Sequence, residues 1–276
     1  MSGKRLTGKV AWVTGSSRGI GRVVAAHLAS LGARVVVHGT TPTSTRQLNE
    51  ADSLDAVARE IADAHGVEVL AVHGDLTSEQ VVEDLHAQIV ARFGQVDILI
   101  NNAGGDIGVR GVTAENAGKP LVNDAVEIPM EDVRIILDRN LMTCILVSRA
   151  VVPSMIEREQ GRIVTIGSIA GLSGHRREVI YATAKAAAHE YTCCLAAQLR
   201  PHGVNANVLA PGEIITPRFM ASRPTREERM VREGPLTRYG WPEEVAKAVE
   251  FLVTEDGSYI TGQVLRIDGG AQIFPS

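Results

Sequence analysis

Short runs of consecutive apolar residues alternate along the chain with longer segments in which apolar residues recur every three or four positions. The first two runs are Val10–Val13 and Arg34–Val37, and a segment with helical spacing, Ile20–Leu31, lies between them. An uninterrupted apolar run predicts a strand covered on both faces, and the longer spacing predicts an amphipathic helix. Further helices and strands are predicted, in alternation, at residues 53–65, 67–72, 79–93, 96–100, 130–158, 162–166, 181–200, 205–209, 242–253 and 263–267.

Regular alternation of strands and helices predicts parallel βαβ units. With right-handed crossovers, these units form an α/β fold of the doubly wound, three-layer Rossmann type, with a parallel seven-stranded sheet flanked by helices. No repeat or linker interrupts the pattern, so residues 1–276 are predicted to form a single domain. Residues 105–128 fit neither period, and we expect a long loop near the ligand-binding end of the sheet.

Composition excludes several classes of function. The chain of 276 residues has a net charge of −4 and therefore lacks the excess of basic residues that is typical of a nucleic-acid binder. No apolar run is long enough to span a bilayer, and Met1–Arg5 lacks the apolar region of a signal peptide. The cysteines, Cys144, Cys193 and Cys194, show no C-x-x-C spacing and are expected to be free thiols. A cytoplasmic globular protein without membrane or nucleic-acid partners is therefore predicted.

A glycine-rich turn, Thr14–Gly21, follows the first strand and opens the first helix. Its first glycine permits a tight turn, and the later ones let a pyrophosphate approach the backbone. The helix N-terminus adds free N–H groups and a positive dipole end. Since a strand precedes the turn and a helix follows it, a dinucleotide is expected to bind at Gly15, Ser17, Arg18, Gly19, Ile20 and Gly21.

The end of the second strand, His38–Thr41, lacks the acidic residue that would hold a ribose 2′-hydroxyl. A carboxylate there would repel a 2′-phosphate, whereas Arg18 and the hydroxyls of Thr40 and Thr41 could bind one. The sequence therefore favours NADP(H) as the cofactor and leaves NAD(H) open.

Two residues with acid–base chemistry, Tyr181 and Lys185, stand at positions i and i+4 of a predicted helix and so share one face. A tyrosine pKa of about 10 is too high for efficient proton transfer near neutrality, but a nearby ammonium favours the phenolate. Ser168, just past a predicted strand, can donate to a substrate oxygen, and Asn140 occupies a mid-helix position that its propensity disfavours.

Together these motifs resemble the classical short-chain dehydrogenases/reductases (SDRs), and among them the 3-oxoacyl-(acyl-carrier-protein) reductases. The resemblance covers nearly the whole chain. It is carried by Thr14-Gly15-x-x-x-Gly19-x-Gly21, Gly74-Asp75-Leu76, Asn101–Gly104, Asn140, Ser168, Tyr181-x-x-x-Lys185, Pro211-Gly212, Tyr259–Gly262 and Asp268–Gly270. It implies an NAD(P)-dependent oxidoreductase that interconverts a secondary alcohol and a ketone by hydride transfer, commonly as a homotetramer or homodimer.

The resemblance also implies roles for individual residues. Tyr181 would exchange a proton with the substrate oxygen, and Lys185 would lower its pKa and hold the nicotinamide ribose. Ser168 would polarise the carbonyl, and Asn140 would fix a water in the proton relay. Further cofactor contacts are implied for Asp75, Leu76, Asn102, Ala103, Gly104, Pro211, Gly212, Ile215 and Thr216, besides Tyr181 and Lys185.

The substrate stays open at this point between a 3-oxoacyl thioester, a sugar or polyol, and a hydroxy acid. His175, Arg177 and Glu178 stand where family members line the substrate site, but a solvated loop or a subunit contact explains them equally well. Residues 216–233 resemble the family's substrate lid. No third ligand accompanies His189 and Cys193, so no metal is expected. The alternative from outside the enzymes is a regulatory protein that binds the cofactor but is catalytically silent.

Overall fold

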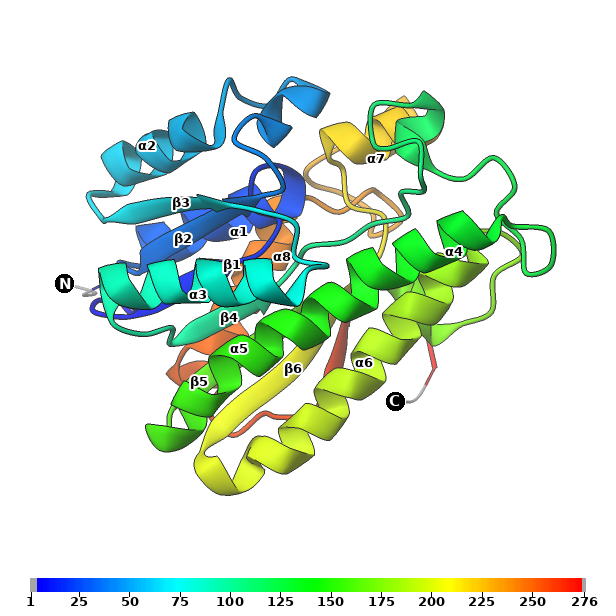
Figure 1. Ribbon diagram of the computed structural model, residues 1–276. Coiled ribbons are helices and arrows are strands. Elements are labelled where there is room, and N and C mark those ends of the chain that lie inside the picture. The colour runs from blue at the N-terminus through cyan, green and yellow to red at the C-terminus, as the bar shows by residue number, and fades with distance from the viewer. Residues whose placement is uncertain (1–3, 275–276) are drawn as a thin grey trace.

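The computed structural model describes residues 4–274 and has a seven-stranded parallel sheet at its centre (Figure 1). Met1–Gly3 of the predicted N-terminal stretch lie outside the described residues. The strand order is β3-β2-β1-β4-β5-β6-β7, which confirms the predicted fold. The strands are β1 (Val10–Val13), β2 (Arg34–Gly39), β3 (Val69–His73), β4 (Ile98–Asn101), β5 (Gly161–Ile166), β6 (Val204–Pro211) and β7 (Val264–Ile267).

Helices cover both faces of the sheet, as the ribbon shows for α3, α5 and α6 in front (Figure 1). Helices α1, α2 and α8 pack on the opposite face. Among residues 4–274, no helix combines the length and the apolar character needed to cross a membrane. The helices are α1 (Gly19–Ser30), α2 (Leu54–His65), α3 (Glu79–Phe93), α4 (Met130–Leu137), α5 (Thr143–Glu157), α6 (Val179–Leu199), α7 (Pro217–Ser222) and α8 (Pro242–Val253).

Strand β1 shows why the strands are apolar throughout. Ala11 and Val13 pack into the core beneath α1, α2 and α8, whereas Val10 and Trp12 pack into the core beneath α3, α5 and α6. Successive side chains of a strand point to opposite faces, and both faces of this sheet are covered. All four residues are therefore fully buried.

The predicted continuous helix at 130–158 is interrupted. A π-helical turn, Asp138–Met142, separates α4 from α5 and contains Asn140. The Asn140 amide donates to the carbonyl oxygens of Ile136 (2.8 Å) and Gly105 (3.0 Å), and its side-chain oxygen accepts from the Gly105 N–H (2.8 Å). A side chain that bonds local carbonyls competes with regular helical bonding, which accounts for an asparagine at this position.

The chain reverses its direction across the sheet between β1 and β4, because β2 and β3 lie on one side of β1 and β5 to β7 lie beyond β4. The loops that follow β1 and β4 therefore leave the sheet side by side. The Thr14 hydroxyl accepts from the backbone N–H groups of Asn102 (2.9 Å) and Ala103 (3.0 Å) and ties the loops together. Open α/β sheets bind ligands in the crevice at such a switch point.

Candidate active site

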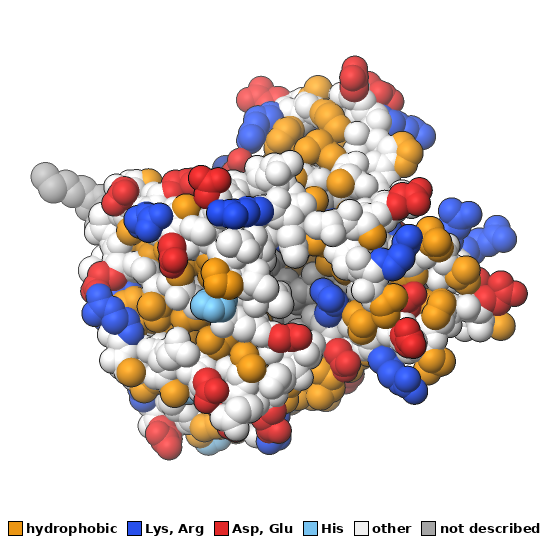
Figure 2. All heavy atoms as spheres, turned by 45° about the horizontal axis from the view of Figure 1, so that its top comes forward, with side chains coloured by type: hydrophobic (Ala, Val, Ile, Leu, Met, Phe, Trp, Pro, Cys, Tyr) orange, Lys and Arg blue, Asp and Glu red, His pale blue; other side chains and the backbone are white. Residues whose placement is uncertain are grey.

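A continuous cleft of about 1190 Å³ opens at this switch point. Figure 2 shows it as a hollow in one face of the molecule, with a basic side chain beside it. Most of the residues expected to contact a cofactor line the cleft: Gly15, Ser17, Arg18, Gly19, Ile20, Gly21, Thr40, Asp75, Leu76, Asn102, Ala103, Gly104, Tyr181, Lys185, Pro211, Gly212 and Thr216. Ser168 and the expected substrate residues His175, Arg177 and Glu178 line it too.

Three expected residues do not line the cleft. Ile215 is buried, with its N–H bonded to the Gly240 carbonyl, and Thr41 is exposed on the loop after β2. The side chain of Asn140 makes its hydrogen bonds with backbone groups, chiefly the N–H and the carbonyl of Gly105. In this structure Asn140 therefore shapes the start of the long loop and lies behind the cleft wall.

The turn after β1 has the close backbone approaches that a dinucleotide requires. Gly15 and Gly19 adopt left-handed conformations (φ 62° and 56°), which favour glycine. A Cβ added at Gly15 would lie 2.9 Å from Ala103 Cα, and one at Gly21 would lie 2.6 Å from the Gly15 oxygen. Glycine at these positions brings the loops after β1 and β4 close together beside the N-terminus of α1, so these residues fit the diphosphate of a nicotinamide dinucleotide.

His38 supports this turn from beneath, a role that no sequence motif indicated. Its Nδ1 accepts from the Gly15 N–H (3.1 Å), so Nε2 carries the proton and donates to the Gly74 carbonyl (3.0 Å). Burial lowers the pKa of His38 to about 4. The imidazole is therefore neutral near pH 7 and keeps the acceptor that orients Gly15.

A carboxylate lies against the turn although the end of β2 has none. Glu50 Oε2 accepts from the Gly19 N–H at 2.8 Å, and the Arg22 guanidinium donates to the Glu50 backbone oxygen at 2.6 Å. The Arg18 guanidinium donates to the Ser44 carbonyl (2.9 Å) and to Gln47 Oε1 (2.7 Å). Burial raises the pKa of Glu50. The segment after β2 thus places a negative group beside the expected phosphate site.

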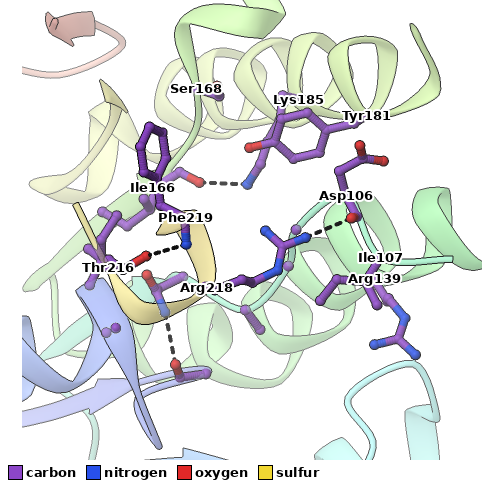
Figure 3. A pocket seen from close by; sticks show the side chains of 18 of the residues that line it. Asp106, Ile107, Arg139, Ile166, Ser168, Tyr181, Lys185, Thr216, Arg218 and Phe219 are labelled. Carbon is purple, nitrogen blue, oxygen red and sulfur yellow. Dashed lines mark hydrogen bonds between the residues drawn. The ribbon is translucent and has the colours of Figure 1, made fainter. Parts of the chain in front are cut away.

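Ser168, Tyr181 and Lys185 lie on the same side of the cleft (Figure 3). Tyr181 and Lys185 come from the first turns of α6, and the Lys185 ammonium lies 5.8 Å from the centre of the Tyr181 ring. The ammonium donates to the Ile166 carbonyl at 2.8 Å. These three side chains come from two different segments, and the fold places a phenol, a hydroxyl and an ammonium in one pocket.

Ser168 is anchored by its neighbours. Its hydroxyl oxygen accepts from the Ala170 N–H (3.1 Å), which leaves the hydroxyl proton free to donate. Its backbone N–H donates to His189 Nε2 (3.3 Å). Burial, with the charge of Lys185, lowers the pKa of His189 to about 4, so the imidazole remains a neutral acceptor. His189 thereby acts as a support for Ser168 at the end of β5.

The electrostatics of Tyr181 differ from the expectation. Burial raises its pKa, and the groups that oppose this rise are the Ser168 hydroxyl and the Arg218 guanidinium. Lys185, which was expected to lower the pKa of Tyr181, is not among them; its ammonium donates to the Ile166 carbonyl. Burial also lowers the pKa of Lys185 itself, to about 8.

The long loop and the expected lid form the outer wall of the cleft. Asp106, Ile107 and Lys119 contribute from the loop, Phe219 contributes from α7, and Arg223 directly follows α7. Glu178 forms ion pairs with Lys119 and with Arg223 (3.3 Å), so it joins the loop, the start of α6 and α7. The carboxylate of Asp106 accepts from the Asn123 amide (2.9 Å), and burial raises its pKa.

Arg218 also faces the pocket, although the sequence analysis did not single it out. Figure 3 shows its guanidinium opposite Tyr181, and it donates to the Asp106 backbone oxygen at 2.6 Å. Asp106 lies 112 positions earlier in the chain, so no local spacing could reveal this contact. Burial lowers the pKa of Arg218.

Comparisons with known proteins agree with this geometry. A family model described as "Enoyl-(Acyl carrier protein) reductase" matches residues 15–272. The chain is 36% identical to a 3-oxoacyl-(acyl-carrier-protein) reductase of Aquifex aeolicus (96% of this chain, 98% of the relative). It is 38% identical to a cyclohexanol dehydrogenase of Rhodococcus sp. strain TK6 (96% of each chain). A 7α-hydroxysteroid dehydrogenase solved with NADH and 7-oxoglycochenodeoxycholic acid superposes with a TM-score of 0.81, at 32% identity over 97% of this chain and 96% of that one. The chain therefore belongs to the short-chain dehydrogenase/reductase family of oxidoreductases.

Proposed function

We propose that this protein interconverts a secondary alcohol and a ketone by hydride transfer, with NADP(H) as the preferred cofactor and Tyr181 as the general acid/base. The observation that carries the proposal is the placement of Ser168, Tyr181 and Lys185 in the same cleft as the glycine-rich turn. A phenol and a hydroxyl converging on one point can hold a carbonyl oxygen and supply its proton.

The cofactor would bind along the turn and supply the hydride, which is chemistry that no side chain provides. The chain's own residues bind, orient and protonate. The free proton of the Ser168 hydroxyl would donate to the substrate oxygen, while Tyr181 would deliver a proton to that oxygen during reduction and accept one during oxidation. The ammonium of Lys185 would face the cofactor ribose, and the charge of Arg218 would favour the phenolate.

The test is a reduction assay with NADPH or NADH and a panel of ketones, followed by the ultraviolet absorbance of the reduced nicotinamide. Turnover with either cofactor excludes the alternative of a silent, cofactor-binding regulatory protein. Turnover that is equal or better with NADH would contradict the proposed preference for NADP(H).

Cofactor choice depends on two opposite charges beside the turn. Arg18 supports a 2′-phosphate, whereas the Glu50 carboxylate at the Gly19 N–H opposes one. We expect Glu50→Gln to raise kcat/KM for NADPH about fivefold relative to NADH, because two unit charges close to water interact by about 1 kcal/mol. Glu60→Gln is the matched control, since Glu60 pairs with Arg22 at 2.6 Å on the surface of α2. An unchanged NADPH-to-NADH ratio in Glu50→Gln would show that its carboxylate does not act on the cofactor.

The pH dependence of ketone reduction should follow the loss of the proton from the Lys185 ammonium. Because burial lowers its pKa to about 8, the ammonium is charged below that pH and loses its proton as the pH rises through it. Tyr181, whose pKa is raised, keeps its proton well beyond this range. We therefore expect kcat/KM for a ketone to fall above about pH 8, and Lys185→Met to remove this step from the profile. A wild-type profile that stays flat to pH 10 would contradict the role of the ammonium.

Two substrate classes follow from different observations. Similarity to carrier-protein reductases supports a 3-oxoacyl thioester. The substrate side of the cleft is lined by charged groups, including Asp106, Lys119 and Glu178, and this lining favours a small polar compound such as a hydroxy acid, a sugar or a polyol. Rates with an acetoacetyl thioester, a polyol series and a hydroxy-acid series would separate the classes.

The family resemblance supports a homotetramer or homodimer that is located in the cytoplasm. The alanine-rich helix α6 would allow the close helix approach that such an interface needs. Sedimentation of the purified protein tests the assembly, and a monomer at micromolar concentration would exclude it.

A further inference from the structure

We propose that Arg218 binds an anionic group of the substrate, so that the protein acts on short oxo acids and the corresponding hydroxy acids. This inference rests on the proposed function and names the substrate class for the same site. It is carried by the unpaired charge of Arg218, by its desolvation and by its place opposite Tyr181.

Arg218 differs from Lys119 of the long loop and from the paired arginines of the lid segment. Lys119 and Arg223 both pair with Glu178, and Arg223 also lies 3.7 Å from Glu213. Arg229 pairs with Glu213 at 2.8 Å. Within residues 4–274, no carboxylate oxygen lies within 4.0 Å of the Arg218 guanidinium. In the described part of the chain, Arg218 therefore has no anionic partner within ion-pair distance, as is also true of five other cations of the cleft, Arg18, Arg139, Arg176, Arg177 and Lys185.

The guanidinium of Arg218 is also poorly solvated. Its Nε is buried and has no hydrogen-bond partner among the described residues. One Nη donates to the Asp106 backbone oxygen, a neutral acceptor, and the carboxylates of Asp106 and Glu178 act on the charge only from beyond 4.0 Å. Proteins bury charged groups beside counter-ions because an unpaired buried charge is costly. A ligand anion would supply that counter-ion here.

Gly105 lets the guanidinium sit close to the long loop. A Cβ added at Gly105 would approach Arg218 Nη1 to 3.3 Å, and the same backbone segment is tied to Asn140. Arg218, on α7, thus lies against the loop, and its charge favours the phenolate of Tyr181. An anion bound there would lie beside the reacting carbonyl, which restricts the substrate to short acids.

The diphosphate of the cofactor is a second source of anionic oxygens. The charges of Arg218 and Arg139 both lower the pKa of Arg18 at the turn, so Arg218 also lies within range of the phosphate side of the cleft. The substrate is favoured because the groups that act most strongly on Arg218 are Tyr181, Asp106 and Glu178, all on the substrate side. If Arg218 binds the substrate, replacing it raises the KM for the acid. If it binds the diphosphate, replacing it raises the KM for NADPH.

The reaction is balanced without any transfer of a proton to or from Arg218. An oxo acid, the reduced nicotinamide and one proton give the hydroxy acid and the oxidised nicotinamide. A C–H bond of the reduced nicotinamide would break as one forms at the carbonyl carbon, and the electron pair of the C=O π bond would pass to the oxygen. That oxygen would take the proton of the Tyr181 hydroxyl, which would regain one from solvent. Arg218 keeps its charge throughout and holds the carboxylate, so it is a binding residue.

The test compares short oxo acids with their methyl esters, for example acetoacetate with methyl acetoacetate, in the wild type, Arg218→Met and Arg218→Lys. We expect the wild type to prefer the acid at least tenfold in kcat/KM. Arg218→Met should lose about a hundredfold on the acid, the loss expected when one partner of a desolvated charge pair is removed, and less than threefold on the ester. Arg218→Lys should recover part of the loss, because it restores the charge without the planar fork.

Arg232→Met is the matched control, since Arg232 pairs with Glu243 on the exposed part of the lid segment. Its acid-to-ester ratio should equal that of the wild type. Thermal unfolding and NADPH binding show whether Arg218→Met is folded. Equal losses on acid and ester, or a raised KM for NADPH with an unchanged KM for the acid, would overturn the inference. A wild type that reduces neutral ketones but shows no preference for acids would overturn it and leave the proposed function intact. Failure with every carbonyl compound would instead refute the proposed function.

Discussion

Replacing Tyr181 by phenylalanine is expected to lower kcat for ketone reduction by about a hundred- to ten-thousandfold, the range for losing a positioned general acid. The ring would remain in the cleft, and only the hydroxyl that carries the proton would be lost. Because the turn after β1 is untouched, binding of NADPH should stay within a factor of about two, measured by its fluorescence.

Tyr191→Phe is the matched control for this experiment. Tyr191 lies on the same helix, α6, and is partly buried against the core beneath α3 and α5, away from the cleft lining. It should keep wild-type turnover. A Tyr181→Phe variant that retains most of its kcat, or a Tyr191→Phe variant that loses its own, would refute the assignment of the proton donor.

Placing a methyl group on the turn, as Gly21→Ala, is expected to raise the KM for NADP(H) at least tenfold. It should also destabilise the fold by roughly 1–3 kcal/mol, the usual cost of overpacking. The added Cβ would lie 2.6 Å from the Gly15 oxygen and would displace the Asn102 amide, which donates to the carbonyls of Thr14 (2.9 Å) and Gly15 (3.1 Å). The shift would open the close packing between the loops after β1 and β4.

Gly174→Ala separates this effect from a general cost of replacing glycine. Gly174 is exposed, and a Cβ added there meets no atom within 4 Å. Its unfolding midpoint in urea and its KM for NADPH should match the wild type. If Gly21→Ala binds NADPH as tightly as Gly174→Ala does, the turn is not the diphosphate site.

Local patterns along the chain were sufficient to predict most of the fold. The apolar runs mark strands because both faces of the sheet are covered, and the period of the intervening segments marks helices. The turn residues and the pair Tyr181 and Lys185 could be predicted because a turn and a helix face are formed by neighbours in sequence. Their chemical roles stay predictions until the variants are measured.

Contacts between distant segments were beyond local patterns. Glu50 accepts from the Gly19 N–H although it lies 31 positions away in the chain. The end of β2 has no acidic residue, so the residues there could not predict a carboxylate beside the turn. The π-helical turn at Asn140 also depends on a distant partner, the Gly105 backbone. Each of these features depends on which loops the strand order places together.

By itself, then, the sequence determined the α/β class, the parallel sheet and the glycine-rich turn, because each follows from the spacing of residues within one element or one turn. Only the tertiary structure decided which charges meet in the cleft. Glu178 forms ion pairs with two cations of the cleft, Lys119 and Arg223. Arg218, which lies against the long loop, has no anionic partner among the described residues. The pairing of charges depends on distances in space, which residue spacing along the chain does not encode.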